Sequence, residues 1–248
     1  MKKEIIHKHY EQLANNFDRF WKPSEENFNK IVSKIIDLLE LRNNDNFLDL
    51  GCGTGLFTKA ISNKVNLKTV SCVDFSDKML KNLKQDNKVK TIKADMVDNF
   101  VKDEEHNKVL LKESIHHIGF NNDFLNALHR KLINNTKVLI VDLDFDNKTF
   151  PFSKKMKNSD IQYQDLLKKQ IKEIENKQIN IKTEELTITS KLYKNLFVEK
   201  IQKRYLSSFS FLTDKEISDE IDFIQNRYKN QENINFNEKY IFYKLSKT

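Results

Sequence analysis

Closely spaced glycines follow an apolar segment near position 50. Residues 47–57 read Phe-Leu-Asp-Leu-Gly-Cys-Gly-Thr-Gly-Leu-Phe, and Gly51, Gly53 and Gly55 are three of only four glycines in the chain. Glycine lets a backbone turn tightly and approach a ligand closely, because it has no side chain. An apolar strand that leads through such a loop into a helix is typical of a nucleotide site. We therefore expect Asp49 and the three glycines to contact a nucleotide-like ligand.

Two further acidic residues follow the next apolar segments. Asp74 ends the segment 70–73 and lies 19 residues after Gly55, a spacing that suits an acceptor for both hydroxyls of a ribose. Asp95 follows residues 92–94 in the same way. The carboxyl ends of parallel strands share one edge of a sheet, so Asp95 is expected within reach of an adenine amino group. Both acids could instead be ordinary turn residues.

A polar run interrupts the apolar segment 109–118. It contains Lys112, Glu113, His116 and His117. Histidine is the natural acid or base near neutral pH, so we predict that one of the two histidines is catalytic, with a slight preference for His117. Lys112 is predicted to contact the cofactor and Glu113 the substrate. The alternatives are a lysine–glutamate pair that only shapes the pocket and histidines that pack in a turn or face solvent.

Three short blocks together resemble a known enzyme family. The blocks LDLGCGTG at 48–55, VDFSDKML at 73–80 and KADM at 93–96 are similar to motifs I to III of the class I S-adenosylmethionine-dependent methyltransferases, of the small-molecule type. The resemblance covers about residues 45–145. A dinucleotide-binding dehydrogenase would carry Gly-x-Gly-x-x-Gly, whereas here Leu56 stands at the third glycine position. The pattern therefore favours a methyltransferase over an NAD enzyme.

The resemblance implies that S-adenosylmethionine is the cofactor and S-adenosylhomocysteine the product. It assigns the methionine end of the cofactor to Asp49 and to the backbone of Gly51, Gly53 and Gly55. It assigns the ribose hydroxyls to Asp74.

The resemblance also implies contacts with the adenine ring. Phe75 and Met79 would flank the ring, although Met79 could equally be a core residue of its helix. Asp95 would accept a hydrogen bond from the adenine amino group, and the Met96 N–H would bind a ring nitrogen.

The N-terminal segment 10–21 resembles a helix that folds over the cofactor as a lid in many small-molecule methyltransferases. Tyr10 and Trp21 are amphipathic aromatic residues, which suits a position between a ligand and solvent. We predict that both contact the substrate. A packed helix without ligand contact is the alternative.

Short apolar segments alternate with segments of helical periodicity along the middle of the chain. The predicted strands are 47–50, 69–74, 90–93, 108–112 and 137–143, and the predicted helices between them are 56–63, 77–85 and 122–132. Two amphipathic helices, 2–20 and 24–42, precede them, with Ser24 as a plausible N-cap. This alternation predicts an α/β fold with a parallel sheet and helices on both faces.

The pattern changes after residue 147. Residues 148–182 favour helix, 186–190 alternate like a strand, and 192–205 have helical spacing, although 198–206 could be a strand. A helix capped by Thr213 or Asp214 should run to about residue 228, and 240–245 should form the last strand. The resemblance implies a doubly wound, mostly parallel, seven-stranded sheet in which this last strand is antiparallel.

We expect one methyltransferase domain over residues 1–248. Its parts would be a helical lid at 1–43, a cofactor-binding core at 44–147, a substrate-side insertion after the fifth strand at 148–212, and a C-terminal helix and strand at 213–248. The lid and the insertion would together cap the pocket, which suits a small acceptor that must be shielded from water.

The composition is that of a globular protein. Hydrophobic residues make up 38% and charged residues 32% of the 248 residues, without an apolar stretch long enough for a transmembrane helix. The N-terminus lacks the apolar core of a secretory signal, and only Cys52 and Cys72 are cysteines, so a cytoplasmic location is expected. No Cys/His cluster has zinc spacing, and we expect no metal. The net charge of +7 comes mainly from dispersed lysines.

These features predict methyl transfer to a small-molecule acceptor by in-line displacement. A nucleic-acid (RNA) methyltransferase is one alternative, supported only by the positive charge, so we do not expect nucleic acid as a partner. A non-catalytic homologue that still binds the cofactor is another, because cofactor binding and acceptor alignment are separate requirements. Aminopropyl transfer has only Glu113 as support. We expect a monomer or a homodimer.

Overall fold

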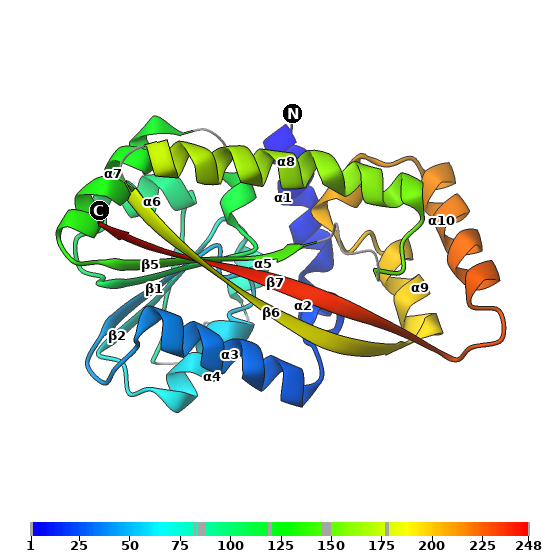
Figure 1. Ribbon diagram of the computed structural model, residues 1–248, viewed down its shortest axis with the longest axis horizontal. Helices are drawn as coiled ribbons and strands as arrows, with labels where there is room; N and C mark the ends of the chain where they lie inside the picture. The colour runs from blue at the N-terminus through cyan, green and yellow to red at the C-terminus, as the bar shows by residue number, and fades with distance from the viewer. Residues whose placement is uncertain are drawn as a thin grey trace.

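A single sheet of seven strands runs through the molecule (Figure 1). The computed structural model of the chain describes residues 2–81, 83, 88–118, 121–144, 150–176 and 179–247. The strand order is β3-β2-β1-β4-β5-β7-β6, which confirms the predicted fold class. The strands are β1 (Asn46–Leu50), β2 (Thr69–Asp74), β3 (Lys90–Lys93), β4 (Lys108–Lys112), β5 (Lys137–Asp144), β6 (Ile179–Tyr193) and β7 (Asn233–Lys247).

Helices cover both faces of the sheet (Figure 1). In chain order they are α1 (Lys2–Leu13), α2 (Phe17–Trp21), α3 (Glu25–Leu39), α4 (Leu56–Lys64), α5 (Asp77–Leu80), α6 (Met96–Lys102), α7 (Asn122–Ile133), α8 (Lys154–Asn176), α9 (Lys194–Gln202) and α10 (Asp214–Arg227). The 3₁₀ helices within the described ranges are η1 (Ala14–Asn16), η2 (Ile115–His117) and η3 (Ser207–Phe211). Helices α3 and α4 lie on one face, and α6, α7 and α8 lie on the other (Figure 1). None of the helices in the described ranges is long and apolar enough to cross a membrane.

The order of the strands places a topological switch point at the centre of the sheet. Strands β1 to β5 are mutually parallel, and the chain leaves β1 towards β2 and β3 but later returns on the other side of β1 to form β4 and β5. Ligands of open α/β sheets bind at such a point, outside the carboxyl ends of the strands. The fold therefore predicts a site beside the carboxyl ends of β1 and β4.

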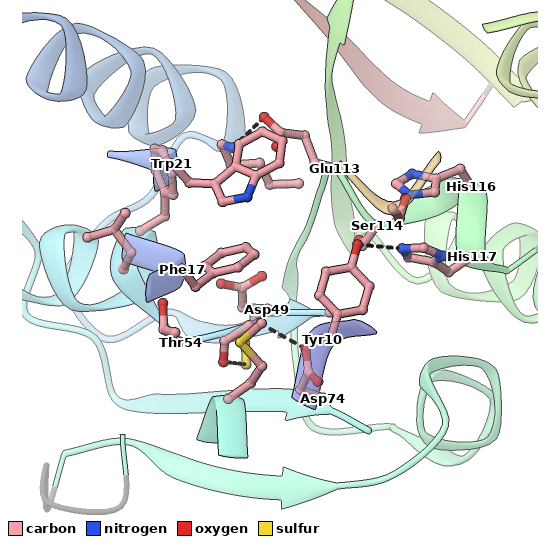
Figure 2. Close-up of a pocket in the computed structure, with 18 of the residues that line it drawn as sticks. Tyr10, Phe17, Trp21, Asp49, Thr54, Asp74, Glu113, Ser114, His116 and His117 are labelled. Carbon is pink, nitrogen blue, oxygen red and sulfur yellow. Dashed lines mark hydrogen bonds and ion pairs between the residues drawn. The ribbon is translucent and has the colours of Figure 1, made fainter. Parts of the chain in front are cut away.

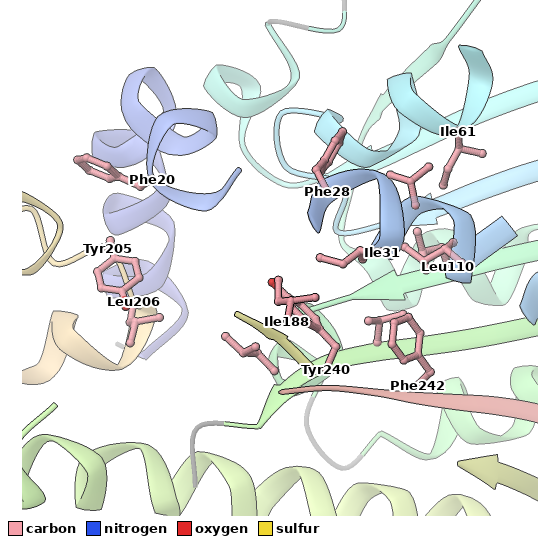
Figure 3. Close-up of a cluster of buried hydrophobic side chains, with 14 of the residues drawn as sticks. Phe20, Phe28, Ile31, Ile61, Leu110, Ile188, Tyr205, Leu206, Tyr240 and Phe242 are labelled. Atoms are coloured by element: carbon pink, nitrogen blue, oxygen red, sulfur yellow. The ribbon is translucent and has the colours of Figure 1, made fainter. Parts of the chain in front are cut away.

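Side chains of successive residues in the central strands pack alternately into two hydrophobic cores. Leu110 packs with Phe28, Ile31 and Ile61 of α3 and α4, whereas its neighbours in β4 face the second core under α6 and α7. Figure 3 shows the first core, which continues to β6 and β7. Burying one such large aliphatic side chain contributes about 1.5–3 kcal/mol, so both faces of the sheet are held firmly.

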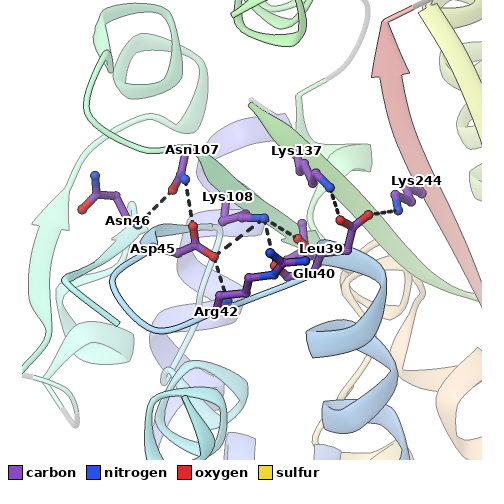
Figure 4. Close-up of polar contacts among 9 residues, drawn as sticks. All are labelled: Leu39, Glu40, Arg42, Asp45, Asn46, Asn107, Lys108, Lys137 and Lys244. Carbon is purple, nitrogen blue, oxygen red and sulfur yellow. Dashed lines mark hydrogen bonds and ion pairs between the residues drawn. The ribbon is translucent and has the colours of Figure 1, made fainter. Parts of the chain in front are cut away.

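The buried Lys108 joins the start of β4 to the end of α3 (Figure 4). Its side chain is only 7% exposed, and its Nζ donates to the carbonyl oxygens of Leu39 at 2.8 Å and Glu40 at 3.0 Å. Burial lowers the pKa of Lys108, although Asp45 opposes the shift. The last carbonyls of a helix lack partners within the helix, and a cation there satisfies them.

The N-terminal predictions need correction. Residues 2–20 do not form one helix, because the 3₁₀ turn η1 separates α1 from α2. Asparagine favours turns over helix interiors, and Asn15 and Asn16 lie in this turn. The predicted helix 24–42 is α3, whose N-cap Ser24 is confirmed and which ends when Glu40 takes a left-handed conformation.

Other boundaries also differ from the predictions. The helix α6 was not predicted, although Asp95 caps it by accepting the Val97 N–H at 2.9 Å. The reading of 198–206 as a strand is wrong, since most of it belongs to α9. The end strands 186–190 and 240–245 are the middle of much longer strands, β6 and β7. Among the described residues of the predicted helix 77–85, only Asp77–Leu80 is helical; residues 82, 84 and 85 lie outside the described residues.

Replacing Lys108 by methionine should destabilise the fold. The substitution keeps most of the apolar stem but leaves two buried carbonyl oxygens without a donor, so we expect a loss of about 1–3 kcal/mol in the free energy of unfolding. Urea denaturation measures this loss. The matched control is Lys137→Met, because the more exposed Lys137 pairs only with the Glu40 carboxylate and should cost less than about 1 kcal/mol. Equal losses in the two variants would contradict the assigned role of Lys108.

Candidate functional site

A pocket opens where the fold predicts it, at the carboxyl ends of the parallel strands (Figure 2). Its walls come from the segments after β1, β2, β3 and β4, from Asp142 of β5, from the N-terminal helices and from the start of η3. The structure brings thirteen of the residues singled out by the sequence to this one pocket. They are Tyr10, Trp21, Asp49, Gly51, Gly53, Asp74, Phe75, Met79, Met96, Lys112, Glu113, His116 and His117.

The floor of the pocket depends on Gly51. Its φ of +75° is strained for other residues, and a Cβ built there would lie 2.5 Å from the Ser114 Cβ and 2.8 Å from the Met96 Sδ. The Ser114 hydroxyl donates to the Leu50 carbonyl at 2.7 Å. The segments that follow β1, β3 and β4 therefore meet at a point where a side chain at position 51 does not fit.

Asp74 holds the glycine loop in place. Its Oδ2 accepts the Gly53 N–H at 2.9 Å, and its Oδ1 accepts the Ser76 N–H at 2.9 Å. The carboxyl group is buried, and this burial raises its pKa, while the N–H donors of Ser76, Gly53 and Phe75 oppose the rise. Each carboxylate oxygen accepts more than one hydrogen bond, so Asp74 can also bind hydroxyl groups in the pocket.

Asp49 lies deeper in the same wall, with 3% exposure. Burial raises the pKa of Asp49 to about 6, and a hydrogen bond from the Thr58 hydroxyl opposes the rise. A buried carboxylate of this kind is stabilised by a cation, because burial disfavours its charged form unless an opposite charge is near. The positive charge of the Lys112 ammonium lowers the pKa of Asp49 and so partly offsets the effect of burial.

Lys112 and Glu113 form an ion pair at the end of β4. The Lys112 Nζ donates to the Glu113 Oε1 at 2.7 Å and lies 4.3 Å from the centre of the Phe57 ring. Glu113 has a φ of +52°, and its N–H donates to the Val141 carbonyl at 2.8 Å. Non-glycine residues with a strained backbone concentrate at functional sites. Here the left-handed conformation of Glu113 directs the chain from the end of β4 along the pocket wall.

The N-terminal helices close the pocket from the side opposite the sheet. A carboxylate of α1, Glu11, accepts a hydrogen bond from the Ser76 hydroxyl, and Asp18 of α2 accepts one from Thr54 of the glycine loop. Phe17 and Trp21 stack against each other, with ring centres 5.9 Å apart. Polar contacts thus fix both short helices over the loops of the site.

Tyr10 connects the N-terminal cover to the histidine pair. Its hydroxyl lies 2.9 Å from the His117 Nε2, and it also bonds to Ser207 (Figure 2). Burial lowers the pKa of His117 to about 4, and a proton on His9 would act in the same direction. Burial also lowers the pKa of His116, whose ring lies 3.8 Å from that of His117. Both imidazoles are therefore neutral near pH 7.

Two of the predicted ligand contacts do not line the pocket. Gly55 is the N-cap of α4, where an added Cβ would meet the Leu83 side chain at 2.3 Å. Asp95 is exposed and caps α6. Their roles toward a ligand stay predictions.

Sequence reasoning missed several residues of the wall. They are Phe17, Cys52, Thr54, Leu56, Phe57, Ser114, Asp142, Leu206, Ser207 and Ser208. Thr54, Leu56 and Phe57 lie inside or beside the glycine motif, and Asp142 directly follows the apolar run of β5. Their positions in the sequence could therefore have identified them as pocket residues. Ser207 and Ser208 gave no such signal, because they lie in a segment without periodicity far along the chain.

Comparisons with known proteins bear on this site. Residues 48–140 match the family model described as a methyltransferase domain. A comparison with curated protein sequences finds no match.

Solved structures share the fold at low sequence identity. Phosphoethanolamine N-methyltransferase 2 of Haemonchus contortus, solved with phosphomonomethylethanolamine and S-adenosylhomocysteine, is 16% identical with a TM-score of 0.60. The match covers 100% of this chain but only 60% of that one, so this chain spans about three fifths of its length. A cyclopropane synthase of Mycobacterium tuberculosis is 12% identical with a TM-score of 0.58, covering 98% of both chains. Precorrin-6y C5,15-methyltransferase of Geobacter metallireducens is 11% identical with a TM-score of 0.53, covering 88% of both.

The buried His9 should make the fold sensitive to acid. Burial, helped by Arg204, lowers the pKa of His9 to about 4, so between pH 7 and pH 5 the unfolded chain takes up a proton there and the folded chain does not. The free energy of unfolding should fall over this range, and His9→Gln should reduce the fall by about 1–2 kcal/mol.

Urea denaturation at pH 7 and pH 5 measures this difference. His129→Gln is the control, because His129 is exposed on α7. If His9→Gln retained the full pH dependence of the wild type, a neutral buried His9 would be ruled out.

Proposed function

Because residues 48–140 match the model of a methyltransferase domain, we propose that this chain is a class I methyltransferase whose pocket binds S-adenosylmethionine beside a small-molecule acceptor and aligns the two. The observation that carries the proposal is the joint position of Asp49, Gly51, Gly53 and Asp74 in one pocket wall at the switch point of the sheet.

The residues present fit the cofactor. Asp49 is a buried carboxylate with a raised pKa, which suits the cationic amino group of the methionine part. Asp74 has acceptor capacity for the ribose hydroxyls, and Phe75 and Met79 line the same side, where they would flank the adenine. Gly51 lines the pocket without a side chain, so a ligand there would meet backbone.

The cofactor supplies an electrophilic methyl group that an acceptor atom takes by in-line displacement. The chain itself must orient the acceptor, exclude water and receive the proton that the acceptor loses. We assign the proton-accepting role to the neutral His117 imidazole, with Tyr10 as the residue that positions the ring through its hydroxyl. His116 lines the same wall and would contact the acceptor.

The cover of the pocket supports a small acceptor. Tyr10, Phe17 and Trp21 close one side, and Leu206 and Ser207 close another, which leaves room for a small molecule shielded from water. The Haemonchus contortus enzyme was solved with a small phosphate-bearing amine. Cytoplasmic location and a monomeric or dimeric state stay predictions.

A nucleic-acid acceptor finds little support in the pocket wall. Lys112 is the one lysine among the described lining residues, and it is paired with Glu113. Phosphate backbones are bound by unpaired lysine and arginine side chains, which would need to continue from the pocket onto the surface.

Replacing Asp74 by alanine should weaken cofactor binding. The substitution removes the acceptor for the ribose and also releases the Gly53 N–H, so we expect the affinity for S-adenosylhomocysteine to fall at least about tenfold to a hundredfold. Isothermal titration calorimetry measures the affinity. The control is Asp98→Ala, an exposed acid on the neighbouring helix α6, which should bind as the wild type does. Undiminished affinity in Asp74→Ala would contradict the assigned cofactor position.

Replacing Tyr10 by phenylalanine should loosen the N-terminal cover. The ring still packs, but the hydrogen bonds to His117 and Ser207 are lost, a change of about 1 kcal/mol or more. Backbone amides of α1 should then exchange with deuterium roughly five to ten times faster, which mass spectrometry measures. Tyr193→Phe is the control, because Tyr193 is 67% exposed. Unchanged exchange in α1 would show that this hydrogen bond does not hold the cover.

A further inference from the structure

The charge of the pocket wall is opposite to that of the whole chain. The chain carries a formal net charge of +7. The charged residues among the described pocket lining are nevertheless four carboxylates and one lysine, namely Asp49, Asp74, Glu113, Asp142 and Lys112. Burial lowers the pKa values of both lining histidines, so they add no positive charge near pH 7. A cavity lined in this way has a negative potential that concentrates positively charged ligands.

The cofactor uses only part of this negative charge. Asp49 is assigned above to its amino group and Asp74 to its ribose, which leaves Glu113 and Asp142 without a cofactor role. S-adenosylmethionine carries a sulfonium, an ammonium and a carboxylate, so its net charge is one positive charge. The pocket therefore keeps an excess of negative charge for a second ligand.

Glu113 and Asp142 lie side by side near the carboxyl ends of adjacent strands. Lys112 of β4 pairs with Val141 of β5, and the Glu113 N–H donates to the Val141 carbonyl at 2.8 Å, so the next residues along the two strands are Glu113 and Asp142. Asp142 is only 2% exposed. Two neighbouring carboxylates with little access to solvent are best stabilised by a cation between them.

Both carboxylates act on the part of the pocket that holds Tyr10 and His117. Burial raises the pKa of Tyr10, and the charges on Asp74, Glu113 and Asp142 add to this rise. The Tyr10 hydroxyl lies 2.9 Å from the His117 Nε2. The negative potential of Glu113 and Asp142 therefore extends to the residues assigned to the acceptor.

The position of Lys112 shows that this wall binds an ammonium group. Its Nζ lies 2.7 Å from the Glu113 Oε1, 4.3 Å from the centre of the Phe57 ring and 5.6 Å from that of Tyr240. A carboxylate together with an aromatic face attracts a cation by charge and by the ring quadrupole. A carboxylate accepts up to about four hydrogen bonds, so Glu113 can bind Lys112 and a ligand cation together.

Aromatic rings continue around the same cavity. The ring centres of Phe17 and Trp21 are 5.9 Å apart, and those of Tyr10 and Phe17 are 6.4 Å apart. Figure 2 shows Phe17 and Trp21 on one side of the pocket and His117 on the other. Among the described residues, the Trp21 Nε1 is one of the buried polar atoms without a hydrogen-bond partner. A polar ligand on this side of the pocket would satisfy it.

We propose that the acceptor is a small amine that binds as its ammonium cation, with Glu113 and Asp142 as its counterions and the aromatic rings around it. This inference rests on the proposed function, because it names the class of acceptor for the same pocket. An acceptor with a carboxylate or phosphate at this place would face two like charges, which is unfavourable.

The test is a calorimetric titration of the S-adenosylhomocysteine complex with benzylamine, benzyl alcohol and benzoate. The three probes share a ring and differ in charge. At pH 8 benzylamine is still an ammonium ion, and Asp49, with a pKa of about 6, is ionised. We expect benzylamine to bind at least about tenfold more tightly than benzyl alcohol, and benzoate to bind more weakly than both.

Variants assign the effect to the two carboxylates. Glu113→Gln and Asp142→Asn should each weaken benzylamine binding about tenfold and leave benzyl alcohol binding unchanged. Asp98→Asn is the matched control, because Asp98 is an exposed acid on α6. Lys112→Met should act in the opposite direction and strengthen benzylamine binding about threefold to tenfold, since it removes the cation that competes for Glu113. A gain in affinity cannot result from misfolding.

The outcomes separate this inference from the proposed function. The ammonium site is overturned if benzylamine does not bind, if benzyl alcohol or benzoate binds as tightly, or if Lys112→Met binds benzylamine no better than the wild type. Failure of the protein to bind S-adenosylhomocysteine overturns the proposed function. In that case the same probes titrated into the free protein still decide the ammonium site.

Discussion

The close approach of three strand ends at Gly51 is the constraint on which the site depends. Gly51 adopts a φ of +75° within van der Waals reach of Ser114 and Met96, so the segments after β1, β3 and β4 share one point. From this point Asp49 and Asp74 face the pocket with fixed geometry, because each is also hydrogen-bonded within the loops. The two hydrophobic cores hold the strands against the helices, and the register of the strands places the groups of the site that lie at the strand ends.

Closure of the pocket combines two kinds of contact. Hydrogen bonds between distant parts of the chain, such as Tyr10 with His117, join the N-terminal cover to the site. The buried side chains of Leu13 and Phe20 anchor the same segment in the first hydrophobic core. A single hydrogen bond contributes about 1 kcal/mol and a buried large apolar side chain about 1.5–3 kcal/mol, so apolar packing holds the cover and hydrogen bonds set its position over the loops.

The parts of the site that follow local rules were predictable from the sequence, and the parts that depend on distant contacts were not. Gly51 and Asp74 stand at strand ends with fixed spacing, so the sequence alone placed them correctly at one pocket. The serines of η3 reach the same pocket from more than 150 residues away, through a segment without periodicity. The long strands β6 and β7 were predicted too short because much of their length is exposed or half-exposed, which weakens the alternation of apolar residues.

The most direct test of the account uses the single tryptophan of the chain. Trp21 lines the pocket, so its fluorescence reports on the site without a label or an acceptor. Titration with S-adenosylhomocysteine should change the Trp21 emission in a saturable way, with half-saturation at micromolar concentration. Emission that stays constant up to millimolar S-adenosylhomocysteine, together with the absence of heat in a parallel calorimetric titration, would contradict the central claim that this pocket is a cofactor site.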